Sequence, residues 1–146
     1  GAQSRWYSNY KSVELMKDFS IKKNINFDLV FQTRMDLVLK KNINFSLIDK
    51  NYIYSNGRDK KKDIIGEMFL ISNYENAIKF ASIFHRLENY SLRPPVAAKQ
   101  HIDYLNLKHL SLLTQQDYEL TRNFLKKNKN FWFKIKKFIK KILNKN

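Results

Sequence analysis

The chain contains no cysteine, three glycines and two prolines in 146 residues. Without cysteine it has no disulfide bond, no thiol nucleophile and no thiolate zinc site. The sequence also lacks a glycine-rich phosphate loop, a Gly-x-Ser-x-Gly elbow and a His-Glu-x-x-His zinc motif. No apolar run approaches the roughly 20 residues that cross a bilayer. Several hydrolytic and redox chemistries therefore find no support in the sequence.

Positive charge is present in excess, and it is unevenly distributed. The formal net charge is +15, and residues 126–146 hold nine lysines and no acidic residue. Removing these nine from the 28 basic residues leaves 19, against 13 acidic residues, in positions 1–125. Because 43% of all residues are apolar and 14% are aromatic, a packed core is expected. We predict one domain over residues 1–125 and a basic tail over residues 126–146.

Hydrophobic spacing predicts strands that alternate with helices. Apolar residues at helical spacing predict an amphipathic helix over Gln3–Ser20. Consecutive bulky apolar residues predict a buried strand that runs from Phe27 to Asp36. Asn73 is a suitable N-cap for a helix with apolar residues on one face. The other predicted elements are strands at Tyr52–Tyr54, Glu67–Ile71 and Leu107–Leu113, a loop over Ser55–Lys62, and a helix from Pro95 to Asn106. This alternation favours an α/β or α+β domain with a mixed sheet.

Arg34 and Asp36 interrupt the apolar segment at the end of the predicted strand. Alternate residues of a strand share a face, so both side chains are predicted to emerge side by side. A carboxylate in this position can hold a divalent cation that bridges diphosphate oxygens, and a guanidinium can form two hydrogen bonds to phosphate. The pair therefore suits a nucleotide diphosphate. A structural ion pair is the alternative, and residue spacing does not decide between them.

The segments QSRWYSNYKSVELMKDF, Phe-Asp-Leu-Val and Thr-Arg-Met-Asp-Leu together resemble bacterial glycosyltransferases of capsule and lipopolysaccharide synthesis. In that group, similar helices precede a Tyr-Asp-Val-Val-x-x-x-Arg-x-Asp-Leu segment. The resemblance implies a fold of the GT-A type, with Arg34 and Asp36 at the donor diphosphate and Asp36 on a divalent metal ion, Mn²⁺ or Mg²⁺. The usual motif has two acids, whereas this sequence has Arg-Met-Asp. No base-binding strand precedes Gln3, so the resemblance implies the C-terminal part of such an enzyme.

Two further sites follow from this comparison. The segment Asp63-Ile-Ile-Gly-Glu-Met-Phe69 is similar to the part of such enzymes that lines the acceptor side. Asp63 and Glu67 are therefore candidates for the general base that takes a proton from a glycan or lipid-linked acceptor. A solvated acid beside the lysines at 60–62 is the alternative. His101, on a predicted helix, is a second candidate metal ligand.

The basic tail has the pattern of a helix that lies in a membrane interface. From Phe131 onward its apolar residues fall within one arc, and the lysines lie outside it. We therefore predict contact with an anionic membrane at the inner face of the bacterial cytoplasmic membrane. The predicted contact residues are Trp132, Lys134, Lys136, Lys137, Phe138, Lys140 and Lys141. Docking on another part of the protein is an alternative, as are nucleic-acid binding, which lacks a recognition motif, and a non-catalytic remnant.

Overall fold

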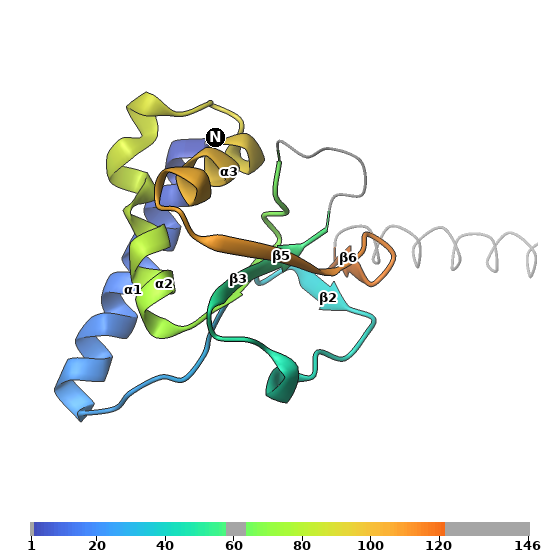
Figure 1. The fold of residues 1–146 in the computed structure, drawn as a ribbon, viewed down its shortest axis with the longest axis horizontal. Helices are drawn as coiled ribbons and strands as arrows, with labels where there is room; N and C mark the ends of the chain where they lie inside the picture. The colour runs from blue at the N-terminus through green and yellow to red at the C-terminus, as the bar shows by residue number, and fades with distance from the viewer. Residues whose placement is uncertain (1, 58–63, 122–146) are drawn as a thin grey trace, which may run out of the picture.

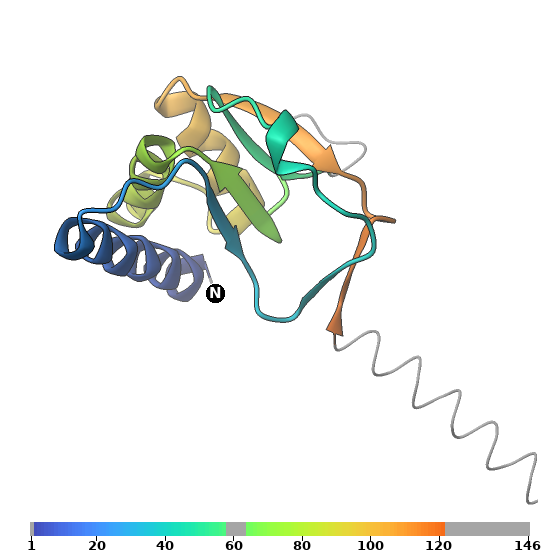
Figure 2. The same ribbon diagram turned by 90° about the horizontal axis from the view of Figure 1, so that it is seen from below.

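The computed structural model describes residues 2–57 and 64–121, which form a mixed α/β fold. A four-stranded mixed sheet is flanked by helices, and a two-stranded ribbon lies beside it (Figures 1 and 2). The helices are α1 (Ala2–Lys23), α2 (Tyr74–Ala81), α3 (Pro94–Tyr104) and the 3₁₀ helices η1 (Phe45–Leu47) and η2 (Ser82–Asn89). The strands are β1 (Val30–Thr33), β2 (Leu37–Leu39), β3 (Tyr52–Asn56), β4 (Phe69–Ser72), β5 (Lys108–Leu113) and β6 (Tyr118–Leu120). The predicted mixed sheet with flanking helices is confirmed.

The sheet has the strand order β1-β4-β3-β5, which leaves β1 at an edge. β4 pairs antiparallel with β1 and β3, whereas β3 and β5 are parallel. The register places Thr33, the last residue of β1, opposite Phe69, the first residue of β4. The segment that follows β1 therefore lies next to the segment that precedes β4. In the ribbon, β2 pairs antiparallel with β6.

Two hydrophobic cores lie on opposite faces of this sheet. The first is shared with the helices and contains Trp6, Ile53, Ile65, Leu70, Phe80, Ile83, Ala97, Ala98 and Ile102. The second contains Tyr54, Phe69, Ile71 and Leu113, with Leu37 and Tyr118 of the ribbon packed against it. Successive residues of β3 and β4 belong to different cores, as the two-residue period of a strand requires. The helices and the ribbon thus cover opposite faces of the sheet.

Asparagine residues fix the ends of two helices. Asn24 takes a φ of 51°, the left-handed conformation that asparagine tolerates, and α1 ends just before it. Asn73 caps α2, because its Oδ1 accepts a hydrogen bond from the Asn76 amide at 2.7 Å. The predicted N-cap is confirmed, although the helical segment changes to a 3₁₀ helix at Ser82.

The predicted buried strand from Phe27 to Asp36 is wrong in both length and burial. The observed strand covers only Val30–Thr33, and its residues alternate between half-buried and exposed. The apolar run is explained by aromatic packing at the sheet edge, where Phe31 contacts the rings of Phe45 and Phe69. The predicted loop from Ser55 is also wrong at its start, because β3 continues through Asn56.

His101 lies in the helical core, where hydroxyl and carbonyl groups surround its ring. The Tyr90 hydroxyl lies 2.9 Å from Nδ1, and the Ser82 hydroxyl lies 3.2 Å from Nε2. Burial of the ring lowers the pKa of His101 to about 4, and the charge of Arg86 acts in the same direction. The hydrogen bond with the Lys79 carbonyl opposes this shift.

Acidification is therefore expected to destabilise the fold between pH 6.5 and pH 4. The unfolded chain binds a proton at His101 in this window and the folded chain does not, so the free energy of unfolding falls by about 3 kcal/mol as the pH drops. Urea unfolding at several pH values measures this slope. His101→Gln is expected to remove most of it, and His85→Gln, at an exposed position, to leave it intact. Equal slopes in all three proteins would contradict the assignment.

Candidate functional site

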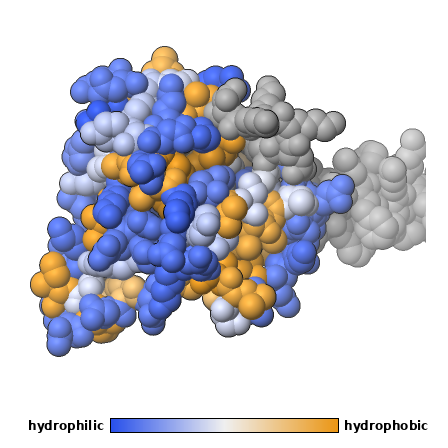
Figure 3. All heavy atoms as spheres, in the orientation of Figure 1, coloured by the Kyte–Doolittle hydropathy of each residue, from blue (hydrophilic) through white to orange (hydrophobic). Residues whose placement is uncertain are grey.

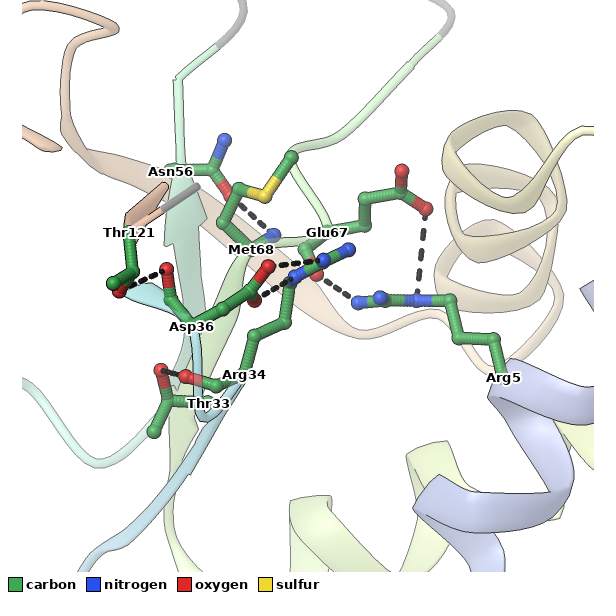
Figure 4. Close-up of polar contacts among 8 residues, drawn as sticks. All are labelled: Arg5, Thr33, Arg34, Asp36, Asn56, Glu67, Met68 and Thr121. Carbon is green, nitrogen blue, oxygen red and sulfur yellow. Dashed lines mark hydrogen bonds and ion pairs between the residues drawn. The ribbon is translucent and has the colours of Figure 1, made fainter. Parts of the chain in front are cut away.

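A groove of about 830 Å³ lies between α1 and the edge of the sheet, where it is lined by β1 and the neighbouring β4. Its charged lining residues are Arg5, Arg34, Asp36 and Glu67. They come from three segments: the start of α1, the turn after β1, and the segment before β4. Figure 4 shows the side chains of Arg34 and Asp36 in contact, with Arg5 facing Glu67 beside them. The fold thus gathers two guanidinium and two carboxylate groups at one place.

Arg34 and Asp36 form a two-pronged ion pair across a turn. Arg34 donates from Nε and Nη2 to the two carboxylate oxygens of Asp36, at 2.7 and 2.8 Å. The Leu37 amide donates to the Arg34 carbonyl at 3.2 Å, which closes a tight turn instead of continuing the strand. The predicted pair is therefore confirmed in its proximity, but strand alternation is not its cause. The two side chains thus form an ion pair at the lining of the groove.

The turn is fixed on both sides by other segments. The Arg34 amide donates to the Met68 carbonyl at 3.3 Å and so continues the pairing of β1 with β4. On the other side, Thr121 follows β6 and donates to the Asp36 carbonyl from its amide, at 2.7 Å, and from its hydroxyl, at 3.1 Å. The position of Asp36 therefore depends on β6, although β6 lies more than eighty residues further along the chain.

Glu67 is placed by a buried asparagine and a close-packed glycine. Asn56 is completely buried; its Oδ1 accepts from the Met68 amide at 2.8 Å, and its Nδ2 donates to the Tyr118 hydroxyl at 2.7 Å. Gly66 packs directly on Asn56, where a Cβ atom would lie 1.9 Å from the Asn56 carbonyl oxygen. The chain thus turns closely around Asn56 and carries the Glu67 side chain into the groove.

Replacing Gly66 with alanine is expected to destabilise the protein by about 3 kcal/mol, since the added methyl group collides with backbone that cannot move aside cheaply. Urea unfolding of the purified variant measures the loss. Ser111→Ala, at an exposed position of β5, is the control and is expected to change stability by less than about 0.5 kcal/mol. A Gly66→Ala variant as stable as the parent would show that the close contact is not required.

Arg5 joins the start of α1 to the segment before β4. Its Nη2 donates to the Glu67 carbonyl, and its Nε lies 3.5 Å from Glu67 Oε2. Burial lowers the pKa of Arg5; the nearby charge of Arg34 lowers it further, and the charge of Glu67 opposes the shift. The hydrogen bonds to Asp36, in contrast, raise the pKa of Arg34. Two positive groups therefore lie close enough to repel each other within the groove.

The residues predicted to hold a metal ion do not meet in the structure. His101 is buried among hydroxyl groups in the helical core and does not line the groove that contains Asp36. Within residues 2–57 and 64–121, no group of three or more histidine, aspartate or glutamate residues could hold a metal ion. The carboxylate of Asp36 is occupied by Arg34. The described residues thus do not fit a divalent metal site held by protein side chains.

Other predicted residues fall outside the described part of the chain, or were missed. Asp63 and the tail residues Trp132, Lys134, Lys136, Lys137, Phe138, Lys140 and Lys141 lie outside the described residues. Sequence reasoning missed Arg5 as a residue of the site. The sequence does show an arginine beside Trp6, at the start of the helix that the family resemblance includes. Residue spacing does not indicate, however, which distant residue this arginine contacts.

Comparison with known protein families, curated proteins and solved structures finds no match to this chain. Among the described helices, none combines the length and the apolar character that a transmembrane span requires. The function is therefore inferred from the groove itself and from the family resemblance of the sequence.

Proposed function

We propose that the chain is a glycosyltransferase with a GT-A-like fold, or the C-terminal part of one, that transfers a sugar from a nucleotide-sugar donor to a surface-polysaccharide acceptor. One observation carries the proposal. The Arg-x-Asp motif and Glu67, which the family resemblance assigns to the donor and acceptor sides, line the same groove. Their segments are about thirty residues apart in the sequence, and the pairing of β1 with β4 brings them together.

The donor diphosphate is assigned to the arginine side of this groove. Arg34 and Arg5 lie on neighbouring parts of its lining, and guanidinium groups match phosphate oxygens in geometry and charge. A volume of about 830 Å³ lies within the range of small-molecule sites. The positive groups would also stabilise the negative charge that develops on the diphosphate as the sugar–phosphate bond breaks.

Glu67 is assigned the role of general base. As the acceptor oxygen bonds to the anomeric carbon, the bond from that carbon to the diphosphate oxygen breaks and the hydroxyl proton passes to the Glu67 carboxylate. The side chain is 15% exposed, and its Oε2 lies 3.5 Å from Arg5 Nε at the lining of the groove. The Glu67 carboxylate thus lines the groove in which the acceptor would bind.

We also propose that the protein attaches to the inner face of the bacterial cytoplasmic membrane, near a lipid-linked acceptor. Apolar residues reach the surface around η1 on the face drawn in Figure 3, where Phe45 and Leu47 are exposed. Apolar groups beside lysines suit the interface of an anionic membrane. The exposed residues Lys40 and Lys41 precede η1 in the sequence. Co-sedimentation of the full chain with anionic vesicles tests this attachment, and a protein that stays in solution would contradict it.

Calorimetric titration with uridine, guanosine and cytidine diphosphate sugars tests the donor assignment. We expect one donor to bind, and the matching nucleoside diphosphate to bind through the same residues. Arg34→Gln is expected to weaken both. If no donor of the panel binds to the full chain, with or without Mn²⁺, the transferase proposal is wrong and a non-catalytic role is favoured.

A further inference from the structure

The two arginines of the groove, Arg5 and Arg34, both donate to carbonyl groups of the segment before β4. Arg5 donates to the carbonyl of Glu67, and the backbone of Arg34 donates to the carbonyl of Met68. The two side chains approach from different elements, α1 and the turn after β1, and both remain partly exposed, by 26% and 33%. The fold therefore holds two cationic side chains next to each other at the surface of the groove.

Each guanidinium keeps donor capacity that the described protein groups do not use. Arg34 donates through Nε and Nη2, and Arg5 donates through Nη2 while its Nε faces Glu67. In residues 2–57 and 64–121, no protein acceptor takes a hydrogen bond from the Nη1 group of either residue. A guanidinium has five N–H donors, so each can bind a phosphate oxygen without breaking its existing contacts.

A divalent cation, in contrast, would have to compete for its ligands. Both oxygens of Asp36 accept from Arg34, at 2.7 and 2.8 Å, and the carboxylate of Glu67 faces Arg5. A metal ion on Asp36 would approach the positive charge of Arg34 and displace its hydrogen bonds. The hydrogen bonds from Arg34 to Asp36 join two charged groups and are therefore stronger than neutral hydrogen bonds. Losing them would oppose the binding of a metal ion.

We propose that the groove binds the diphosphate of its ligand without a divalent cation, because Arg5 and Arg34 together supply the positive charge that a metal ion would otherwise supply. The inference rests on the proposed function for the identity of the diphosphate as that of a nucleotide-sugar donor. It assigns a ligand-binding role to Arg5, and it makes Asp36 a positioning residue for Arg34 instead of a metal ligand.

Calorimetric titration with inorganic pyrophosphate, in EDTA and in Mg²⁺ at fixed ionic strength, tests this assignment on the full chain. We expect binding in EDTA, with an affinity that Mg²⁺ raises by less than about threefold. Arg5→Gln and Arg34→Gln are each expected to weaken binding about tenfold or more, since each removes a charge-assisted contact. Arg93→Gln, at an exposed position before α3, is the matched control and is expected to leave the affinity unchanged.

Asp36→Asn separates the two roles of the carboxylate. The substitution weakens the contact that positions Arg34, but it also removes a negative charge that repels pyrophosphate. Because these two effects oppose each other, binding in EDTA is expected to stay within about threefold of the parent. Circular dichroism shows whether each variant keeps its fold. Binding that requires Mg²⁺ and is lost in Asp36→Asn would overturn the inference, and so would binding that both groove arginine variants leave unchanged.

The same titrations distinguish this inference from the proposed function. Pyrophosphate that binds in EDTA through Arg5 and Arg34, in a protein that binds no nucleotide sugar, would support the two-arginine site and overturn the transferase proposal. A nucleotide sugar that binds only with Mn²⁺ or Mg²⁺ would support the transferase and overturn the metal-free site. Absence of pyrophosphate binding under both conditions would overturn the metal-free site as well.

Discussion

Substituting Glu67 with glutamine is expected to lower the turnover of sugar transfer by about 100-fold to 10,000-fold, the range over which a positioned general base contributes to catalysis. Glutamine has nearly the same shape but cannot accept the proton of the acceptor hydroxyl. It also keeps the backbone carbonyl that accepts from Arg5, so the segment before β4 is expected to keep its place.

The measurement is the initial rate of transfer from the donor that binds, followed by release of the nucleoside diphosphate. Donor affinity is expected to change much less than turnover, because the carboxylate acts on the acceptor. Glu88→Gln, at an exposed position of η2, is the control that loses the same charge elsewhere. A Glu67→Gln protein with parental turnover would remove Glu67 from the mechanism.

Replacing Arg34 is expected to have the largest effect on donor binding. Arg34→Gln is expected to weaken binding of the donor about 10-fold to 100-fold, because a hydrogen bond to a charged group contributes about 1.5–3 kcal/mol. Arg34→Lys keeps the positive charge but loses the planar group that bonds Asp36 through two nitrogens, so an intermediate loss is expected. Calorimetry measures both variants against the parent.

The Arg34 variants also test whether the ion pair is only structural. In that case Arg34→Gln would lower stability and leave donor affinity intact, once the fraction of folded protein is taken into account. Urea unfolding of the same samples supplies that correction. The pair is partly exposed, and ion pairs of this kind contribute about 1 kcal/mol or less to stability. A large loss of affinity with a small loss of stability is therefore the expected combination.

Local sequence patterns predicted the features that depend on residues close together in the sequence. The cap at Asn73 and the apolar face of α2 follow from residues within a few positions of one another, and the structure confirms both. Arg34 and Asp36 were also found from the sequence, because they are only two residues apart. Their pairing arises from a turn, however, in which the Leu37 amide donates to the Arg34 carbonyl. The apolar residues around this turn predicted a continuous strand instead.

Local sequence patterns could not predict the contacts between segments that are far apart in the sequence. The contact between Arg5 and Glu67 joins residues 62 positions apart, and neither residue has a local feature that indicates the other. The need for glycine at position 66 comes from the buried Asn56 beneath it. His101 has the chemistry of a metal ligand, and only the fold shows that hydroxyl groups surround it. Each of these features depends on how the sheet brings its strands together.

The groove between α1 and the edge of the sheet is proposed to bind the diphosphate of a nucleotide sugar. A two-dimensional ¹H–¹⁵N NMR titration of the full chain with the donor panel locates the bound donor residue by residue. We expect one donor to shift the amide signals of residues 30–36 and 67–70 and the side-chain Nε–H signals of Arg5 and Arg34. Signals that do not move with any donor, or that move only in parts of the chain away from this groove, would contradict it.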